Sequence, residues 1–190
     1  MTFDFAAARQ TMVDSQVRVN DVTDLSIQSA MRRVAREGAL AADKSVLAYA
    51  DCEVEYAPGR WLLRPRDAAK LLQAVRPRAG ETALAIAAPY LALVLRDIGL
   101  TVERFDGEDL KAAPAGPYDV IVCEGAVGVV PPSWTAALAV GGRLAVIVRD
   151  GPVGRVRLYT RTELDLGFRQ VFDATPPVLP GLAAEHGFAF

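Results

Sequence analysis

The sequence has few of the residues that carry metal or nucleophilic chemistry. Its 190 residues include two cysteines, Cys52 and Cys123, and one histidine, His186. No CxxC or HExxH spacing occurs, so we expect no metal site. Both cysteines have apolar neighbours, which favours two buried free thiols. One histidine near the terminus argues against Ser-His-Asp or Cys-His catalysis, and the lack of a GxxxxGK[ST] motif argues against nucleotide hydrolysis.

An excess of charge and long apolar runs are also missing. The formal net charge is -2, which gives no general attraction to nucleic acid or anionic lipid. No stretch approaches the roughly 18 apolar residues of a membrane span. The N-terminus has no basic segment followed by an apolar run, as a signal peptide would. We therefore expect a cytoplasmic protein that binds neither nucleic acid nor membrane.

The length and composition are those of one globular domain, with 52% hydrophobic and 23% charged residues. We expect a single domain over residues 1–190. Its N-terminal part, residues 1–78, would hold helices and a substrate loop, and residues 79–190 would form a sheet. The first helix would follow the capping residues Asp21 and Thr23 and end at Gly38. Irregular extended segments follow over 45–63, and further helices are predicted over 65–75, 89–98 and 131–140.

Short apolar runs alternate with these helices, which indicates buried parallel strands. The runs cover residues 82–87, 119–123 and 143–148, and residues 100–105 are a plausible further strand between the first two. Residues 155–161 and 168–173 instead alternate apolar and polar side chains, which is typical of antiparallel strands with one wet face. The order predicts a Rossmann-like α/β fold. It would have a mostly parallel sheet, helices on both faces and antiparallel strands at the C-terminus.

Several segments together resemble the protein-L-isoaspartate O-methyltransferase family. The matching segments read RQTMVDSQVR at 9–18, DVTD at 21–24, AM at 30–31, VARE at 34–37, AYAD at 48–51, GET at 80–82, PYDVIV at 117–122 and GGRL at 141–144. The resemblance covers most of the chain. It implies a class I methyltransferase fold that uses S-adenosylmethionine to methylate isoaspartyl carboxylates in damaged proteins.

The sequence departs from this family at the cofactor loop. The family has an acidic residue and a Gly-x-Gly-x-Gly turn after the first core strand, because the backbone must bend sharply and approach the ligand closely. Residues 85–90 read AIAAPY here, with Ala85 at the acidic position and no glycine. Pro89 also fixes φ and removes a backbone donor. The positions that match the cofactor site, in degenerate form, are Ala85, Ala87, Ala88, Pro89 and Tyr90.

A second departure lies in the substrate loop. Residues 59–65 read GRWLLRP where the family has G-x-T-I-S-x-P, so Leu63 stands at the serine position. Leucine cannot hydrogen-bond a carboxylate, and we therefore expect no catalytic residue. Trp61 and Leu63 would fill space in the core. If the former cleft is closed, Pro89 and Tyr90 should pack into it with them.

A third departure is a short connection. Gly99 and Pro117 are close in sequence where the family has a further helix and strand, so we expect a sheet with one β-α unit fewer. Two alignments of the segment between them stay open. Glu103 would stand at the acidic position that binds a ribose, or residues 106–109, with Asp109, would match a later turn near the adenine. As an alternative to both, these acids simply cap a solvated turn.

Basic residues gather near the C-terminal strands, at Arg149, Arg155, Arg157 and Arg161. They are better interpreted as a solvated, edge-protecting strand face than as an anion site. Two functions remain. The first is a methyltransferase-like protein without catalysis and without a cofactor, which binds a protein partner or itself, for example as a homodimer. The alternative is an active S-adenosylmethionine-dependent isoaspartyl methyltransferase in protein repair, and cofactor titration separates the two.

Overall fold

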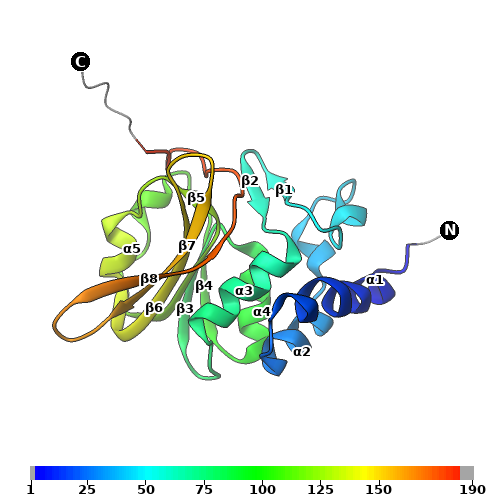
Figure 1. The fold of residues 1–190 in the computed structure, drawn as a ribbon, viewed down its shortest axis with the longest axis horizontal. Helices are drawn as coiled ribbons and strands as arrows, with labels where there is room; N and C mark the ends of the chain where they lie inside the picture. Colours follow the sequence, from blue (N-terminus) through cyan, green and yellow to red (C-terminus); the bar gives the residue numbers. More distant parts are fainter. Residues whose placement is uncertain (1–2, 185–190) are drawn as a thin grey trace, which may run out of the picture.

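The computed structural model describes residues 3–184 as an α/β fold around one six-stranded sheet, with a separate two-stranded hairpin (Figure 1). The sheet order is β4-β3-β5-β6-β7-β8. Its strands are β3 (Thr82–Ile86), β4 (Thr101–Phe105), β5 (Tyr118–Val127), β6 (Leu138–Arg149), β7 (Gly154–Arg161) and β8 (Leu166–Asp173). The first four run parallel, and β7 and β8 are antiparallel to their neighbours. This confirms the fold predicted from the alternation of apolar runs and helices.

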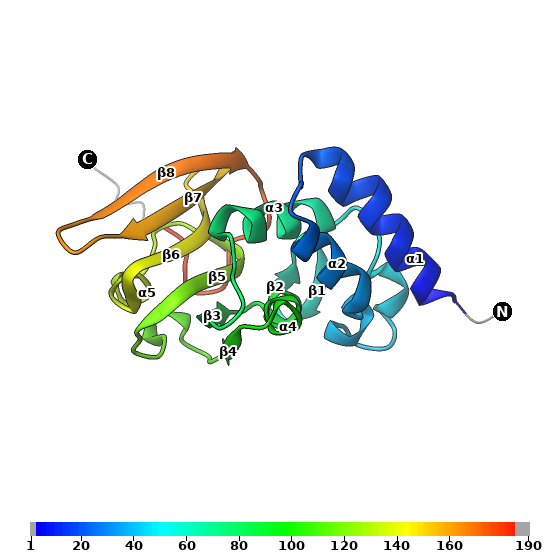
Figure 2. The ribbon, with the colours of Figure 1, turned by 90° about the horizontal axis from the view of Figure 1, so that it is seen from below.

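Helices lie on both faces of the sheet (Figure 2). On one face lie α3 (Pro65–Val75) and α4 (Pro89–Ile98), and α2 (Leu25–Arg33) packs against both. Outside them lies α1 (Phe5–Met12), while α5 (Pro132–Ala136) covers the other face. Each of α3 and α4 begins with a proline, where a missing N–H costs nothing. They end at Arg76 and Gly99 in the left-handed conformation, as the sequence predicts for Gly99.

Shorter elements connect these layers. The hairpin consists of β1 (Val54–Ala57) and β2 (Arg60–Leu62), joined by a turn at Pro58 and Gly59. The remaining turns of helix are η1 (Val13–Val17), η2 (Arg18–Asn20), η3 (Arg36–Ala39), η4 (Ser45–Leu47) and η5 (Leu110–Ala112). Within the described chain, no helix has both the length and the apolar character that crossing a bilayer would require.

The sheet separates two apolar cores. The core between the sheet and α1 to α4 includes Ala85 and Val122, and the core under α5 includes Ile86 and Trp134. Alternate residues of β3 and β5 therefore enter opposite cores, which explains why these two strands are largely apolar, whereas the edge strand β4 (TVERF) is mostly exposed. The connection from β4 to β5 contains only η5, so the sheet ends at β4, as the short connection predicts.

Several local predictions were wrong. Residues 5–17 are helical although only Met12, Val13 and Val17 among them are buried, and α2 is capped by Asp24 rather than by Asp21 or Thr23. The helix ends at Arg33, well before Gly38, because the chain turns extended at Val34.

Two further predictions, on the helix over 131–140 and on the cysteines, need correction. The helix predicted over 131–140 is only α5, because β6 begins at Leu138 and already includes Gly141 and Gly142. Of the two cysteines, Cys123 is buried but Cys52 is only half-buried. Cys52 follows the turn of residues 48–51 at the rim of the core rather than lying in a strand.

Candidate functional site

The carboxyl ends of β3 and β5 form the edge where a doubly wound sheet holds its ligand. After β3 the chain turns through Ala87 and Ala88 directly into α4. Ala87 has a φ of 46°, in the left-handed region that glycine adopts most easily. The sharp bend expected of a cofactor loop is therefore kept, although each glycine of such a loop is absent.

The positions that match the cofactor site lie inside the protein. Ala85, Ala87, Ala88 and Tyr90 have 0% of their surface exposed, and Pro89 is also buried. A ligand at this loop would have to displace the side chains that now surround it. The prediction that Pro89 and Tyr90 pack into the former cleft is consistent with this burial.

A carboxylate of the chain itself lies against the N-terminus of α4. Glu124, near the end of β5, is fully buried and accepts hydrogen bonds from the backbone N–H groups of Tyr90 (3.2 Å) and Leu91 (3.3 Å). The backbone N–H of Leu63 also bonds to this carboxylate. A helix N-terminus attracts anions through its free N–H groups and its dipole. Glu124 thus supplies from within the chain the negative charge that a bound ligand would otherwise bring.

A buried guanidinium accompanies this carboxylate. Arg36 has 0% exposure and donates from Nε to the carbonyl of Ala48 (2.7 Å) and from Nη2 to the carbonyl of Leu63 (2.5 Å). Its Cζ lies 4.8 Å from the centre of the Tyr90 ring, a cation–π contact. Burial raises the pKa of Glu124 to about 7, while the charge of Arg36 and the backbone N–H groups act to lower it. Desolvation also lowers the pKa of Arg36, which the charge of Glu124 partly offsets.

Three polar atoms of this group have no hydrogen-bond partner: Nη1 of Arg36, the hydroxyl of Tyr90 and Oε1 of Glu124. A buried polar atom without a partner costs about 1–3 kcal/mol. The group therefore carries a free-energy cost that nearby apolar packing must offset. We name Arg36, Tyr90 and Glu124 the buried polar triad.

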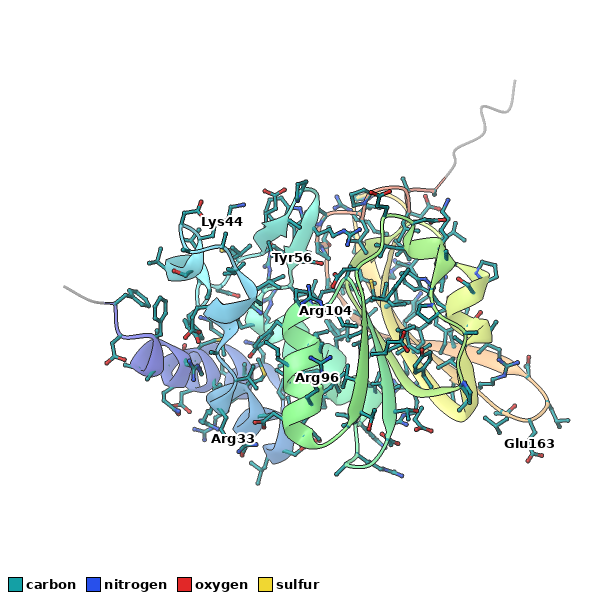
Figure 3. The ribbon with its side chains drawn as sticks, turned by 180° about the vertical axis from the view of Figure 1, so that it is seen from behind. Arg33, Lys44, Tyr56, Arg96, Arg104 and Glu163 are labelled. Carbon is teal, nitrogen blue, oxygen red and sulfur yellow. The ribbon has the colours of Figure 1, made fainter. Side chains whose placement is uncertain are left out.

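The β1–β2 hairpin covers the carboxyl end of β4. Arg60 donates to the carbonyls of Asp106 (2.8 Å) and Gly107 (2.6 Å), and the hydroxyl of Tyr56 donates to the Asp106 carboxylate (3.3 Å). Arg104 also pairs with Asp106, and Figure 3 shows Tyr56 and Arg104 close to one another. Asp106 is thus the residue that fastens the hairpin over this edge.

Residues 177–182, which we name the C-terminal strap, cover the end of β5. The N–H of Ala126 donates to Pro177 (3.2 Å), and the N–H of Leu179 donates back to Ala126 (2.8 Å). The N–H of Gly128 bonds to Leu182 (2.6 Å). Leu179 lies so close to Gly125 that a methyl group there would meet its Cγ at 2.7 Å. The strap therefore adds a short parallel pairing that occupies the sheet edge beside the triad.

Leu63 and Trp61, the two substrate-loop residues that were expected to fill the cleft, differ in their burial. Leu63 is fully buried and its backbone meets both Arg36 and Glu124, so it lies in the centre of the site. Trp61, in contrast, is only half-buried on β2, and the expectation that it fills the cleft was wrong.

The acidic residues proposed for the ribose and adenine do not join the triad. Glu103 lies within β4, is exposed and accepts a hydrogen bond from the hydroxyl of Tyr118. Asp109 caps η5, where its carboxylate accepts from the N–H of Lys111 (2.9 Å). Asp109 therefore caps a turn, as the third interpretation predicts, whereas Glu103 lies in a strand and caps none.

The C-terminal arginines are partly engaged. Arg149 donates to the carbonyls of Gly151 and Pro176, and Arg161 donates to carbonyls at the end of α5. Arg157 lies over the ring of Phe168. These contacts favour the structural interpretation of this cluster. His186 lies outside the described residues.

Sequence reasoning missed Glu124, Arg36 and the role of Asp106. Glu124 interrupts an otherwise apolar strand, and an ionisable residue inside a buried run is a signal that should have been followed. Arg36 gave no such signal, because arginine in a polar stretch is ordinarily a surface residue.

The geometry offers little room for S-adenosylmethionine. The loop after β3 has no exposed surface, the N–H groups of α4 are taken by Glu124, and the strap and hairpin cover the sheet edge. The residues present in this conformation do not fit the cofactor. Chemically, the site can hold one proton on the carboxyl group of Glu124, beside the positive charge of Arg36. Among the described residues no cluster of three or more His, Cys, Asp or Glu side chains could hold a metal ion.

Comparisons with known proteins agree on one family. No family model matches the chain. It is 32% identical to protein-L-isoaspartate O-methyltransferase 1 of Rhodopseudomonas palustris (strain HaA2), over 85% of this chain and 78% of that protein. It is 30% identical to the protein-L-isoaspartate O-methyltransferase of Methylorubrum populi, over 78% of this chain and 82% of that protein.

Solved structures of the same kind share the fold. One, from Plasmodium falciparum, is assigned to protein-L-isoaspartate O-methyltransferase and was solved in complex with S-adenosyl-L-homocysteine. It superimposes with a TM-score of 0.75 at 13% identity, over 90% of this chain and 97% of the other. A second protein-L-isoaspartate O-methyltransferase gives a TM-score of 0.70 at 19% identity, over 92% of this chain and 67% of the other.

Proposed function

The chain belongs to the protein-L-isoaspartate O-methyltransferase family, and from this premise we propose that it is a member without methyl transfer, which acts as a binding or assembly module. A shared fold does not carry activity, which depends on the residues of the site. The family's cofactor would have to reach a loop whose residues are fully buried. One observation carries the proposal: the carboxylate of Glu124 holds the N-terminal N–H groups of α4.

Loss of the substrate serine supports the same proposal. Methyl transfer requires the acceptor carboxylate to be held close to the methyl donor in a fixed orientation. Leu63, at the serine position, contributes only its backbone groups, and these are bonded to Glu124 and Arg36. Donor and acceptor positions are thus both occupied by the chain's own groups.

The active alternative keeps one specific observation in its favour. Ala87 retains the left-handed bend that a cofactor loop requires. An active enzyme would need the β1–β2 hairpin and the C-terminal strap to move away together, which breaks the hydrogen bonds of Arg60 and Leu179. Cofactor binding would then be weakened by the free energy of that opening.

The experiment is calorimetric titration of the purified protein with S-adenosylmethionine and with S-adenosyl-L-homocysteine. An assay of methyl transfer to an isoaspartyl peptide runs beside it, with an active family member as positive control. We expect no binding heat, no methyl transfer and no thermal shift, whereas a ligand at about 100 times its Kd would stabilise the fold by roughly 2.7 kcal/mol. Micromolar binding together with methylation would establish the active alternative.

The partner of this module is proposed to be another protein or a second copy of the chain, for example in a homodimer. The uncovered edge at β4 motivates self-association, since a free strand edge invites pairing. Sedimentation velocity over a wide concentration range tests the homodimer. A monomer at every concentration would leave a different protein as the proposed partner.

A further inference from the structure

A groove that shares no residue with the triad reaches the amino ends of β3 and β6. It has a volume of about 600 Å³ and lies between the end of α3 and β8. Its floor includes Ala74, Pro77, Val171 and Phe172. A shallower hollow, which shares Arg76, Arg78 and Arg169 with it, continues toward Gly141. We name both together the amino-edge groove.

Positive side chains without anionic partners line this groove. Arg76, Arg78 and Arg169 are exposed, and in the described residues none of their side chains forms an ion pair or hydrogen bond. Lys70 lies over the ring of Phe172, with Nζ 5.0 Å from its centre. These four cations converge although the whole chain is slightly acidic, with a net charge of -2.

The acidic residues of the groove are already engaged. Asp24 caps α2, and Glu81 forms an ion pair with Arg143 (2.8 Å). The carboxylate of Asp119 accepts from the N–H and the hydroxyl of Thr82 (2.8 and 2.9 Å). These carboxylates keep their charge, but their oxygens are bonded to other groups, and none of them is paired with Arg76, Arg78 or Arg169.

The groove is bounded by an edge strand. In the described sheet β8 pairs only with β7, so its other edge carries unpaired backbone N–H and C=O groups. Residues 166–170 are exposed, and the β7–β8 hairpin projects from the body of the protein (Figure 1). An extended peptide can add to such an edge through backbone hydrogen bonds, with side-chain pockets giving specificity.

We propose that the amino-edge groove binds an extended acidic segment of a partner protein, which adds along the edge of β8 and places carboxylates against Arg76, Arg78 and Arg169. The apolar floor accepts the uncharged side chains that alternate with the carboxylates along such a strand. Arginine suits this role because its planar guanidinium bonds carboxylates with two parallel N–H groups. The groove shares no residue with the buried triad, so this binding specifies a partner for the proposed binding function and does not depend on whether methyl transfer occurs.

The test uses a fluorescein-labelled peptide of about eight residues in which glutamate alternates with valine. A peptide with glutamine in place of glutamate is the ligand control. Binding to the full chain is followed by fluorescence anisotropy in low and in moderate salt. We expect the acidic peptide to bind, to weaken as salt rises, and to protect amides of residues 166–173 from hydrogen exchange.

Two charge reversals separate the groove from general electrostatics. R169E should weaken peptide binding by about tenfold or more, because it places a carboxylate where the ligand's own carboxylate must lie. R155E is the matched control, since Arg155 is an exposed arginine on β7 that does not line the groove. It should change binding by less than about twofold, as expected for a distant surface charge.

Three outcomes would overturn the proposal. These are equal weakening by R155E and R169E, equal binding of the glutamine peptide, and no added amide protection in residues 166–173. Tripolyphosphate and a single-stranded oligonucleotide serve as competitors. If either displaces the peptide at much lower concentration than unlabelled peptide does, the groove is a polyphosphate or nucleic-acid site and not a peptide site.

Discussion

At the scale of single residues, Glu124 links the geometry of the site to the stability of the protein. Its carboxylate is fully buried, and burial raises its pKa from an ordinary value of 4.5 to about 7. Arg36 from η3 and the ring of Tyr90 from α4 face it. Removing one partner of such a buried pair leaves an uncompensated charge, which is more costly than leaving the pair intact.

This raised pKa predicts a specific pH dependence. Between pH 4.5 and about 7 the folded protein binds one proton more than the unfolded chain, so the free energy of unfolding should fall as pH rises. The slope approaches about 1.4 kcal/mol per pH unit and flattens above pH 7. Urea unfolding of the protein and of E124Q between pH 5 and 8 measures it, since glutamine has no proton to lose.

The difference between the two proteins is the informative quantity. Burial also raises the pKa of Asp67, which acts in the same direction but is present in both and cancels. A free energy of unfolding that changes with pH equally in both proteins would show that Glu124 is not the titrating group.

The residues of the triad also mark the limit of sequence interpretation. Leu63 and the positions from Ala85 to Tyr90 could be located because they depart from the residues that the family has in its substrate loop and its cofactor loop. Arg36 could not, because its burial depends on the carbonyls of Ala48 and Leu63, which only the folded chain brings to it. From the sequence, Asp106 could be assigned only to a turn. Its hydrogen bond with the distant Arg60 forms only in the folded chain, so the neighbouring residues do not predict it.

At the scale of elements, the C-terminal strap depends on a close approach between two backbones. Gly125 has a φ of 151° and its added methyl would meet Leu179, while Gly167 on β8 has no atom within 4 Å of that position. G125A should therefore destabilise the protein by about 1–3 kcal/mol through overpacking. G167A, the matched control, should stay within about 0.5 kcal/mol. Urea unfolding of both variants measures the difference.

Hydrogen exchange can show where G125A disturbs the structure. In G125A, hydrogen exchange at Leu179 should accelerate because its bond to Ala126 is disturbed. In a double-mutant cycle, G125A should cost less in the L179A background than in the unmodified protein, since the shortened side chain no longer meets the new methyl. Equal destabilisation by G125A and G167A, or full additivity of G125A and L179A, would mean that the strap does not pack on Gly125 in solution.

Elements with strong local signals were found from sequence, and elements held by distant contacts were not. The helices α3 and α4 have an opening proline and an apolar stripe at helical spacing. In contrast, α1 buries only Met12 and is held by Arg9, which bonds to Tyr49 and Glu37. The strap has no periodic pattern, so its pairing with β5 could not be predicted.

At the scale of the whole molecule, closure of the carboxyl edge is shared by four segments. The substrate loop contributes Leu63, β5 contributes Glu124, and the C-terminal strap and the hairpin cover the outside. In a close-packed interior, filling one position does not depend on one residue alone. A single substitution toward the family pattern should therefore disturb the packing without restoring a site.

L63S is the sharpest case, because it restores the family's serine. Replacing a fully buried leucine by a small polar residue removes apolar contacts and leaves a cavity, so we expect a loss of about 2–5 kcal/mol in the free energy of unfolding. Glu124 would still hold the N–H groups of α4, and calorimetry should detect no binding of S-adenosylmethionine. If L63S instead binds the cofactor or methylates an isoaspartyl peptide, the closure rests on one side chain. In that case the fold is a methyltransferase blocked only at its substrate loop.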